Sequence, residues 1–201
     1  MTSESSSGTD HGATAPTGAP AVPPVRLAPW PADGAALLRS LNSPQMTAYL
    51  GGPGTEQQLT DRHRRYLDLS GPGRMYAIVL LPTGDAVGSI GFWEQARYGG
   101  PGYETGWGVL PEFQGRGIAV AAARAVIDAA RAEGRHRALH AFPAVRHAAS
   151  NAVCRRAGFT LRGECSVEYP KGHLRRAYDW RFDLGAAPPA PCGPADEARP
   201  V

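Results

Sequence analysis

The segment from Tyr103 to Glu133 constrains the fold more than any other part of the chain. Tyr103 to Leu110 has the pattern of a β-strand, and Ile118 to Glu133 is rich in alanine and predicts a helix. Gly115 and Gly117 lie in the short turn between them. A helix begins with N–H groups that lack partners and with the positive end of its dipole, and glycines let a ligand approach the main chain. The segment therefore predicts a strand–turn–helix unit that binds pyrophosphate.

Two common nucleotide-binding patterns are excluded at this turn, and a third fits. The chain contains no GxxxxGK[ST] loop, and Val120 stands where a GxGxxG or GxGxxA fingerprint needs a small residue. No Ser, Thr, Asp or Asn is placed to cap the helix, which leaves its first N–H groups for a ligand. The residues Gln114, Gly117 and Ala119 instead fit the pattern Q/R-x-x-G-x-G/A.

The rest of the folded unit alternates between strand and helix patterns. Thr55 to Gln58 has the form of a capping box, and Gly134 and Gly158 suit the residues that follow two helices. Trp107 lies between two glycines, which indicates a β-bulge or a close backbone approach. Helices are predicted at 33–40 with Asp33 as N-cap, 55–69, 118–133 and 148–157, and strands at 25–28, 75–81, 86–95, 103–110, 138–142, 159–167 and 174–184. This order predicts a layered α/β fold with a largely antiparallel sheet.

The turn pattern resembles that of the GNAT superfamily of N-acetyltransferases, and two neighbouring stretches extend the likeness. His147 to Phe159 resembles the family's N-x-x-S-…-G-F segment, and Glu104 to Gly117 resembles the branch that includes the ribosomal-protein N-terminal acetyltransferases. The resemblance implies a GNAT fold, with a mixed, mostly antiparallel sheet of about seven strands, splayed between its fourth and fifth strands and flanked by about four helices. It also implies acetyl-CoA as cosubstrate and direct transfer to a primary amine without an acetyl-enzyme.

The resemblance further assigns residues that would bind the cofactor. The turn would hold pyrophosphate through main-chain N–H groups, and the end of the fourth strand would pair with the pantetheine arm as a neighbouring strand does. His147 stands where the family usually has an Asn that contacts pantetheine. The residues so assigned are Val109, Leu110, Gln114, Gly115, Arg116, Gly117, Ile118, Ala119, His147 and Ser150.

Two residues are candidates for proton transfer. An amine attacks only when neutral, so a base must take its proton, and Glu104 is the candidate, directly or through water. The alternative for Glu104 is a structural hydrogen bond. Ser150 matches the family position near the thioester sulfur, where it would assist the leaving thiolate, and its alternative or additional role is to cap the helix that ends at Ala157. Cys154 stands where many other GNAT enzymes have a Tyr acid, and we expect it to be a small buried residue.

Composition sets the domain organisation. Residues 1–24 and 185–201 are rich in small residues and proline, so we expect two disordered tails around one folded domain at 25–184. That domain holds all but one of the 21 basic residues and all but four of the 18 acidic ones, a positive balance that suits a polyanionic ligand or a solvated surface. Three cysteines without zinc spacing predict a reduced, cytoplasmic protein without a metal. No apolar run is long enough to span a membrane.

Three functions are compatible with these features. An N-acetyltransferase acting on a small-molecule or peptide amine uses both the turn and the two proton-transfer candidates, whereas a non-catalytic acyl-CoA-binding module needs the turn alone. A nucleic-acid-binding protein ranks last because no element interleaves basic and aromatic residues. The acceptor stays open between a protein N-terminus, an antibiotic or other small amine, and a polyamine, as does the choice between monomer and homodimer. The loops at Arg97 to Gly102 and Tyr169 to His173 are expected to border the acceptor site.

Overall fold

The computed structural model describes residues 23–68, 70–71, 73–95, 101–169 and 172–185. The two expected tails lie outside the described residues, except for Pro23, Pro24 and Gly185. Pro24 belongs to the folded part, since its carbonyl accepts a hydrogen bond from the N–H of Leu81 at 2.9 Å. Most of the loop expected at Arg97 to Gly102 also lies outside the described residues.

Seven strands form one mixed sheet in the order β1-β2-β3-β4-β5-β7-β6. Each neighbouring pair is antiparallel except β4 and β5, which are parallel. The mostly antiparallel seven-stranded sheet expected from the sequence is thus confirmed. The strands are β1 Val25–Pro29, β2 Gly73–Leu80, β3 Ala86–Gln95, β4 Gly102–Val109, β5 Ala138–Ala141, β6 Thr160–Glu168 and β7 Leu174–Asp183.

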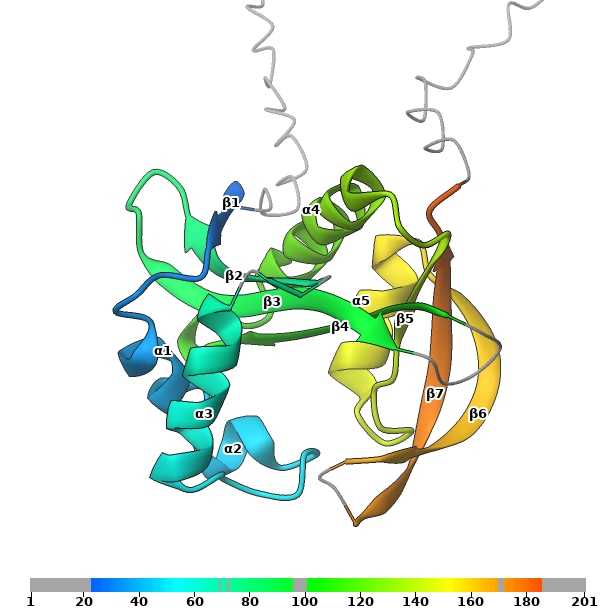
Figure 1. The fold of residues 1–201 in the computed structure, drawn as a ribbon, viewed down its shortest axis with the longest axis horizontal. Helices are drawn as coiled ribbons and strands as arrows, with labels where there is room; N and C mark the ends of the chain where they lie inside the picture. The colour runs from blue at the N-terminus through cyan, green and yellow to red at the C-terminus, as the bar shows by residue number, and fades with distance from the viewer. Residues whose placement is uncertain (1–22, 69, 72, 96–100, 170–171, 186–201) are drawn as a thin grey trace, which may run out of the picture.

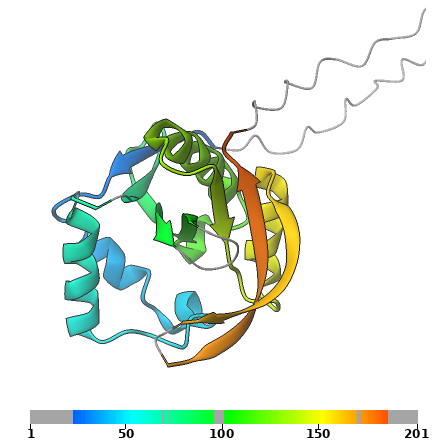
Figure 2. The same cartoon turned by 45° about the vertical axis from the view of Figure 1, so that its right-hand side comes forward.

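Helices cover both faces of the sheet. Figure 1 shows α4 and α5 on one side of the strands and α1, α2 and α3 on the other. The β6–β7 hairpin runs along one edge of the molecule, and its far end approaches the segment that follows α2 (Figures 1 and 2). The helices are α1 Ala35–Ser40, α2 Pro44–Thr47, α3 Glu56–Leu67, α4 Ile118–Glu133 and α5 Ala148–Ala157, with a 3-10 turn at Pro111–Phe113.

The main core lies between the sheet and the pair α4 and α5. Helix α4 places its buried residues three or four positions apart, from Ile118 to Ala130, which is the apolar stripe of an amphipathic helix. Tyr103 of β4 and Trp180 of β7 complete this core from the sheet. Smaller clusters lie on the other face, and none of the described helices is long and apolar enough to cross a membrane.

The sequence signals for helix starts were correct for one helix and not for two others. The capping box at the start of α3 is present, with Thr55 and Gln58 exchanging hydrogen bonds at 2.8 and 3.3 Å. The cap expected at Asp33 is wrong, because α1 begins after Gly34 and without a side-chain cap. The short helix α2 was not expected, although Ser43 caps it and Pro44 opens it.

The two glycines that flank Trp107 do not mark a bulge. Strands β3 and β4 pair without a register shift from Gly88 to Gln95, so of the two alternatives considered for these glycines the bulge is wrong. A Cβ at Gly106 would lie 3.1 Å from the ring of Trp93, and one at Gly108 would lie 3.2 Å from Leu41. The close approach of neighbouring side chains therefore explains both glycines.

Candidate functional site

Strands β4 and β5 part after two paired positions. Their parallel register joins Tyr103 to Leu139 and Glu104 to His140, while β4 continues along β3 as far as Val109. Beyond Glu104, β4 therefore has a strand partner on one side only. An open strand edge offers N–H and C=O groups to an extended ligand.

Hydrogen-bond alternation shows which groups of β4 face this open edge. The N–H of Leu110 donates to the carbonyl of Val87, on the β3 side, at 2.9 Å. Since residues of a strand alternate in direction, the main-chain groups of Val109 and Trp107 face the open edge instead. The carbonyl of Val109 accepts a hydrogen bond from Nε2 of Gln114 at 2.8 Å. Of the two residues expected to pair with pantetheine, Val109 thus faces the edge, and the N–H of Leu110 does not.

The turn after β4 leaves the start of α4 without a side-chain cap. Gly115 and Gly117 have φ values of 74° and 80°, in the left-handed region where glycine costs least. The N–H groups of Val120 and Ala121 both donate to the carbonyl of Gly117 at 3.1 Å. The N–H groups from Gly115 to Ala119 precede these two, and they have no acceptor one turn before them in helix geometry. This arrangement suits an anion at the helix start.

Other residues of the turn lie as a main-chain cradle requires. Gln114, Gly115 and Arg116 are exposed, whereas Ile118 is buried in the core below α4. The guanidinium of Arg116 lies 5.7 Å from the centre of the Phe113 ring. The outer side of the turn is thus open to solvent, and its inner side is fixed by packing.

Glu104 is half-buried on the sheet face opposite the main core. It pairs with Trp93 of β3 and with His140 of β5, so its side chain shares a face with theirs. Arg175 of β7 lies near enough for its charge to interact with that of Glu104. Burial lowers the pKa of the Arg175 guanidinium, and the attraction of Glu104 opposes that effect.

Ser150 is the third residue of α5 rather than its cap. The N-cap is His147, which makes no side-chain capping bond, so the capping role considered for Ser150 is wrong. Ser150 is half-buried, and no hydrogen bond joins its hydroxyl to another described residue. It lies on a different element from Glu104, in the first turn of α5.

His147 lies between α5 and the segment after α2. Its ring stacks on that of Tyr49, with centroids 4.2 Å apart and planes 15° from parallel. Burial and the charge of Arg175 lower the pKa of this imidazole. The ring is therefore neutral at neutral pH.

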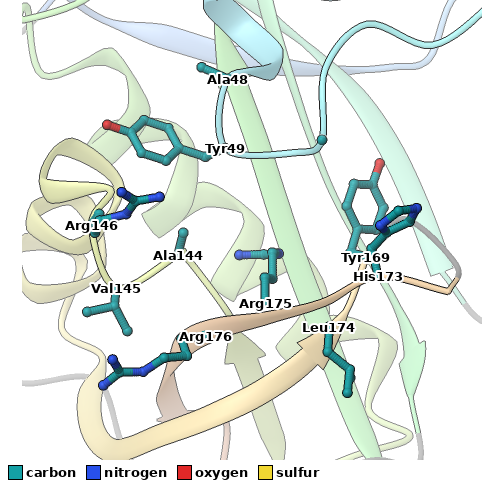
Figure 3. A pocket seen from close by; sticks show the side chains of 11 residues that line it. Ala48, Tyr49, Ala144, Val145, Arg146, Tyr169, His173, Leu174, Arg175 and Arg176 are labelled. Atoms are coloured by element: carbon teal, nitrogen blue, oxygen red, sulfur yellow. The ribbon is translucent and has the colours of Figure 1, made fainter.

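A cavity of about 550 Å³ lies beside these residues (Figure 3). Three segments distant in the sequence form its wall: the stretch after α2, the loop between β5 and α5, and the start of β7 with residues just before it. Two residues from the ends of the loop expected near the acceptor, Tyr169 and His173, are among them. The lining residues are Ala48, Tyr49, Gly51, Ala144, Val145, Arg146, Tyr169, His173, Leu174, Arg175 and Arg176.

A buried acid–base pair was not expected from the sequence. Nδ1 of His140 lies 2.7 Å from Oδ1 of Asp179, and His140 is 6% exposed. Asp179 alternates with apolar residues of β7 in the sequence, which predicts a solvent-facing position, but its side chain is mostly buried beside His140 of β5. No local pattern could have joined residues of two strands so far apart in the chain.

Cys154 and Asn151 of α5 are structural. Cys154 is fully buried, as expected, and burial raises the pKa of its thiol to about 12. Asn151 accepts from Nε1 of Trp180 at 2.9 Å and donates to the carbonyls of Ala144 and His147. These bonds fix the loop that carries His147. No group of His, Cys, Asp and Glu side chains in the described part of the chain could hold a metal ion.

Comparisons with known proteins agree on the fold. The sequence profile of the acetyltransferase (GNAT) domain matches residues 25–160. An acetyltransferase from Agrobacterium tumefaciens is 25% identical, with 79% of this chain and 90% of that chain covered and a TM-score of 0.64. A Salmonella typhimurium enzyme that modifies the N-terminal serine of a 50S ribosomal subunit protein is 20% identical, with 79% and 94% covered and a TM-score of 0.65. No curated protein sequence matches the chain significantly.

A third solved structure extends the range of acceptors in this fold. Spermidine N-acetyltransferase from Vibrio cholerae, in complex with CoA and spermine, is 13% identical, with 80% of this chain and 95% of that chain covered and a TM-score of 0.65. Its acceptor is a polyamine and that of the Salmonella enzyme is a protein N-terminus. The fold alone therefore leaves the acceptor open.

Proposed function

The chain belongs to the acetyltransferase (GNAT) domain family, and from this premise we propose that it transfers an acetyl group from acetyl-CoA directly to a primary amine. The observation that carries the proposal is the uncapped turn at Gly115 and Gly117 beside the open edge of β4. The uncapped turn suits a pyrophosphate, and the open strand edge suits the extended pantetheine arm. A cytoplasmic location and a monomeric or homodimeric state remain predictions.

The donor would bind across two neighbouring parts of the chain. Main-chain N–H groups from Gly115 to Ala119 would hold the pyrophosphate, since they have no acceptor within α4. The open edge at Val109 and Trp107 would hold the pantetheine arm, with Gln114 keeping the end of the strand in place. When bound, acetyl-CoA supplies a thioester carbonyl that an amine can attack.

Glu104 and Ser150 would handle the protons of the reaction. The new C–N bond forms as the C–S bond breaks, so the nitrogen must lose a proton and the sulfur must accept a hydrogen bond or a proton. Glu104 would take the proton of the amine, directly or through water. Ser150 would donate to the departing sulfur, and since a thiol of this type has a pKa of about 8.5, that assistance need only be modest.

The first test is the response of thermal stability to nucleotides. A ligand that binds only the folded state raises the free energy of unfolding by about 2.7 kcal/mol at 100 times its dissociation constant. Acetyl-CoA and CoA should raise the melting temperature clearly, and NAD and ATP should raise it much less. Equal shifts with all four would contradict the donor assignment.

The second test separates an enzyme from a non-catalytic acyl-CoA-binding module. Free-thiol release from acetyl-CoA is measured against a panel of primary amines, and the acetylated amine is identified by mass spectrometry. Amine-dependent release together with the matching product supports transfer. A melting shift with acetyl-CoA but no product from any amine would favour the binding module.

A further inference from the structure

The cavity beside Glu104 is strongly basic. Arg146, Arg175 and Arg176 line it together with His173, and its wall contains no Asp or Glu among the described residues. Figure 3 shows Arg175 in the middle of the wall, with Arg146 and Arg176 on one side and His173 on the other. Arg176 forms an ion pair with Glu164, whereas no such pair joins Arg146 or Arg175 to a described residue within ion-pair distance.

Arg175 is the residue of this wall with an unsatisfied buried hydrogen-bond donor. One guanidinium nitrogen donates to the carbonyl of Phe142 at 3.0 Å, but the buried Nε has no hydrogen-bond partner in the described part of the chain. Buried donors without a partner are rare because they lose their hydrogen bonds to water. The charge of Arg175 also lowers the pKa of His147, so its positive field reaches the loop that carries His147.

A second cavity, of about 430 Å³, continues the basic surface. It shares Gly51 and Tyr169 with the first cavity, and Arg62 and Arg65 of α3 line it beside Asp61. A polycation would meet repulsion along this path, because sites for polycations need carboxylates in excess. The same path attracts anions.

We propose that the acceptor of this chain is a primary amine that also carries a carboxylate, with Arg175 binding the carboxylate, Arg146 contacting it at the rim, and the amine directed to Glu104. A guanidinium binds a carboxylate through a fork of parallel hydrogen bonds, which fixes its orientation. Glu104 and Arg175 have opposite charges that interact with each other, so they complement the two charged ends of one acceptor. The inference rests on the proposed acetyl transfer and names its substrate class.

Two sources could supply this chemistry, namely a small amino acid or a peptide with acidic residues next to its free N-terminus. A cavity of about 550 Å³ accommodates either, being within the usual range for small-molecule sites. The test therefore includes both. The peptide arm uses tetrapeptides with amidated ends that differ only at the second and third positions, which are glutamate, glutamine or arginine. The small-molecule arm compares glutamate with its diamide, and spermidine serves as the polycation.

The measurement is free-thiol release with product identification by mass spectrometry for each acceptor. The acidic member of at least one arm should have a kcat/KM about tenfold or more above its neutral and cationic counterparts, the ratio expected for a hydrogen-bonded charge pair. Spermidine should be the poorest acceptor. Neutral or cationic acceptors used as well as acidic ones, or no turnover of any acidic acceptor by protein that binds acetyl-CoA, would overturn the inference.

Three variants locate the effect in the cavity. Arg175→Gln should raise the KM for the acidic acceptor about tenfold or more, with a smaller change in kcat and an unchanged Kd for acetyl-CoA. Arg146→Gln, at an exposed position that tolerates substitution, should act in the same direction. The matched control is Arg162→Gln, which is exposed on β6, lines neither cavity and should change nothing.

The variants also separate failure of this inference from failure of the proposed function. An unchanged KM in both Arg175→Gln and Arg146→Gln would overturn it, and so would a loss of acetyl-CoA affinity in either, since the cavity would then hold the donor. If Arg175→Gln does not fold, Arg146→Gln and the salt dependence of the wild-type KM decide. That KM should rise with ionic strength for an acidic acceptor alone. Absence of acetyl-CoA binding by the wild type would instead defeat the proposed function.

Discussion

The side-chain amide of Gln114 donates a hydrogen bond to the main-chain carbonyl of Val109 at 2.8 Å. This bond joins the end of β4 to the turn that opens α4, so it fixes the strand edge and the uncapped helix start relative to each other. Gln114 of the Q/R-x-x-G-x-G/A pattern thus stabilises the position of the turn, whereas Gly115 and Gly117 provide its main-chain geometry. The same nitrogen also donates a hydrogen bond to the sulfur of Met46 at 3.4 Å.

Gln114→Ala should therefore weaken CoA binding without unfolding the protein. A hydrogen bond of this kind contributes about 0.5–1.5 kcal/mol, which corresponds to a Kd raised by a few-fold to about tenfold. Losing the same bond should lower the free energy of unfolding by no more than about 1.5 kcal/mol, so the exposed substitution should leave the protein folded. Calorimetric titration with CoA measures the effect, and Gln57→Ala, at an exposed position of α3, is the control. Equal affinities for the two variants would deny Gln114 this role.

Glu104→Gln tests the proposed base through the pH profile. If Glu104 takes the proton of the amine, the variant should lose most activity at low pH, where the neutral amine is scarce, and recover part of it as pH rises. If Glu104 only supports Arg175, the rate should follow the loss of stability and keep the wild-type pH profile. The measurement is kcat/KM against pH with the best acceptor, together with the melting temperature.

Ser150→Ala should lower turnover far more than CoA affinity. General acid–base assistance is typically worth about 10²-fold or more, although a good leaving thiolate reduces the need for it. Because Ser150 lies inside the first turn of α5 rather than at its cap, alanine should not destabilise the helix. Ser40→Ala, at the end of α1, is the matched control. Wild-type turnover in Ser150→Ala would remove the residue from the mechanism.

His147→Phe should change how stability depends on pH. The pKa of His147 is lowered in the folded protein, so the unfolded chain gains a proton first as pH falls through about 6.5, and stability is lost on the acidic side. Phenylalanine keeps the contact with Tyr49 but cannot be protonated. From about pH 7.5 to about 5.5, the variant should lose less free energy of unfolding than the wild type. Parallel losses in denaturant titrations would contradict this.

The part of the fold that follows from short-range rules could be predicted from the sequence. Gly134 and Gly158 end their helices in the left-handed conformation, as expected. Few residues other than glycine tolerate that conformation. Alternation and turn residues were enough to predict seven strands in their order along the chain, but not their order in the sheet. The parting of β4 and β5 came instead from the family resemblance, since no local pattern encodes which strands fail to pair.

The residues around the cavity illustrate what the sequence could not provide. In the sequence, nothing distinguishes Arg175 from the other arginines. Only the folded structure brings it near Glu104 and His147. His140 and Asp179 meet because β5 and β7 are neighbours in the sheet, although β6 follows β5 in the chain. The capping roles considered for Asp33 and Ser150 are wrong because several residues near each helix start could have served as the cap.

Calorimetric titration with acetyl-CoA of the wild type, Gly117→Glu and Gly134→Glu tests the central claim most directly. Gly117 and Gly134 lie at opposite ends of α4 with φ values of 80° and 73°, so each substitution carries a similar backbone strain of about 1–2 kcal/mol and the same added charge. If the turn holds the pyrophosphate, the wild type and Gly134→Glu should bind acetyl-CoA alike, and Gly117→Glu should bind at least about tenfold more weakly, because its carboxylate repels the phosphates. Equal affinity in all three proteins, or no binding by the wild type, would contradict the account.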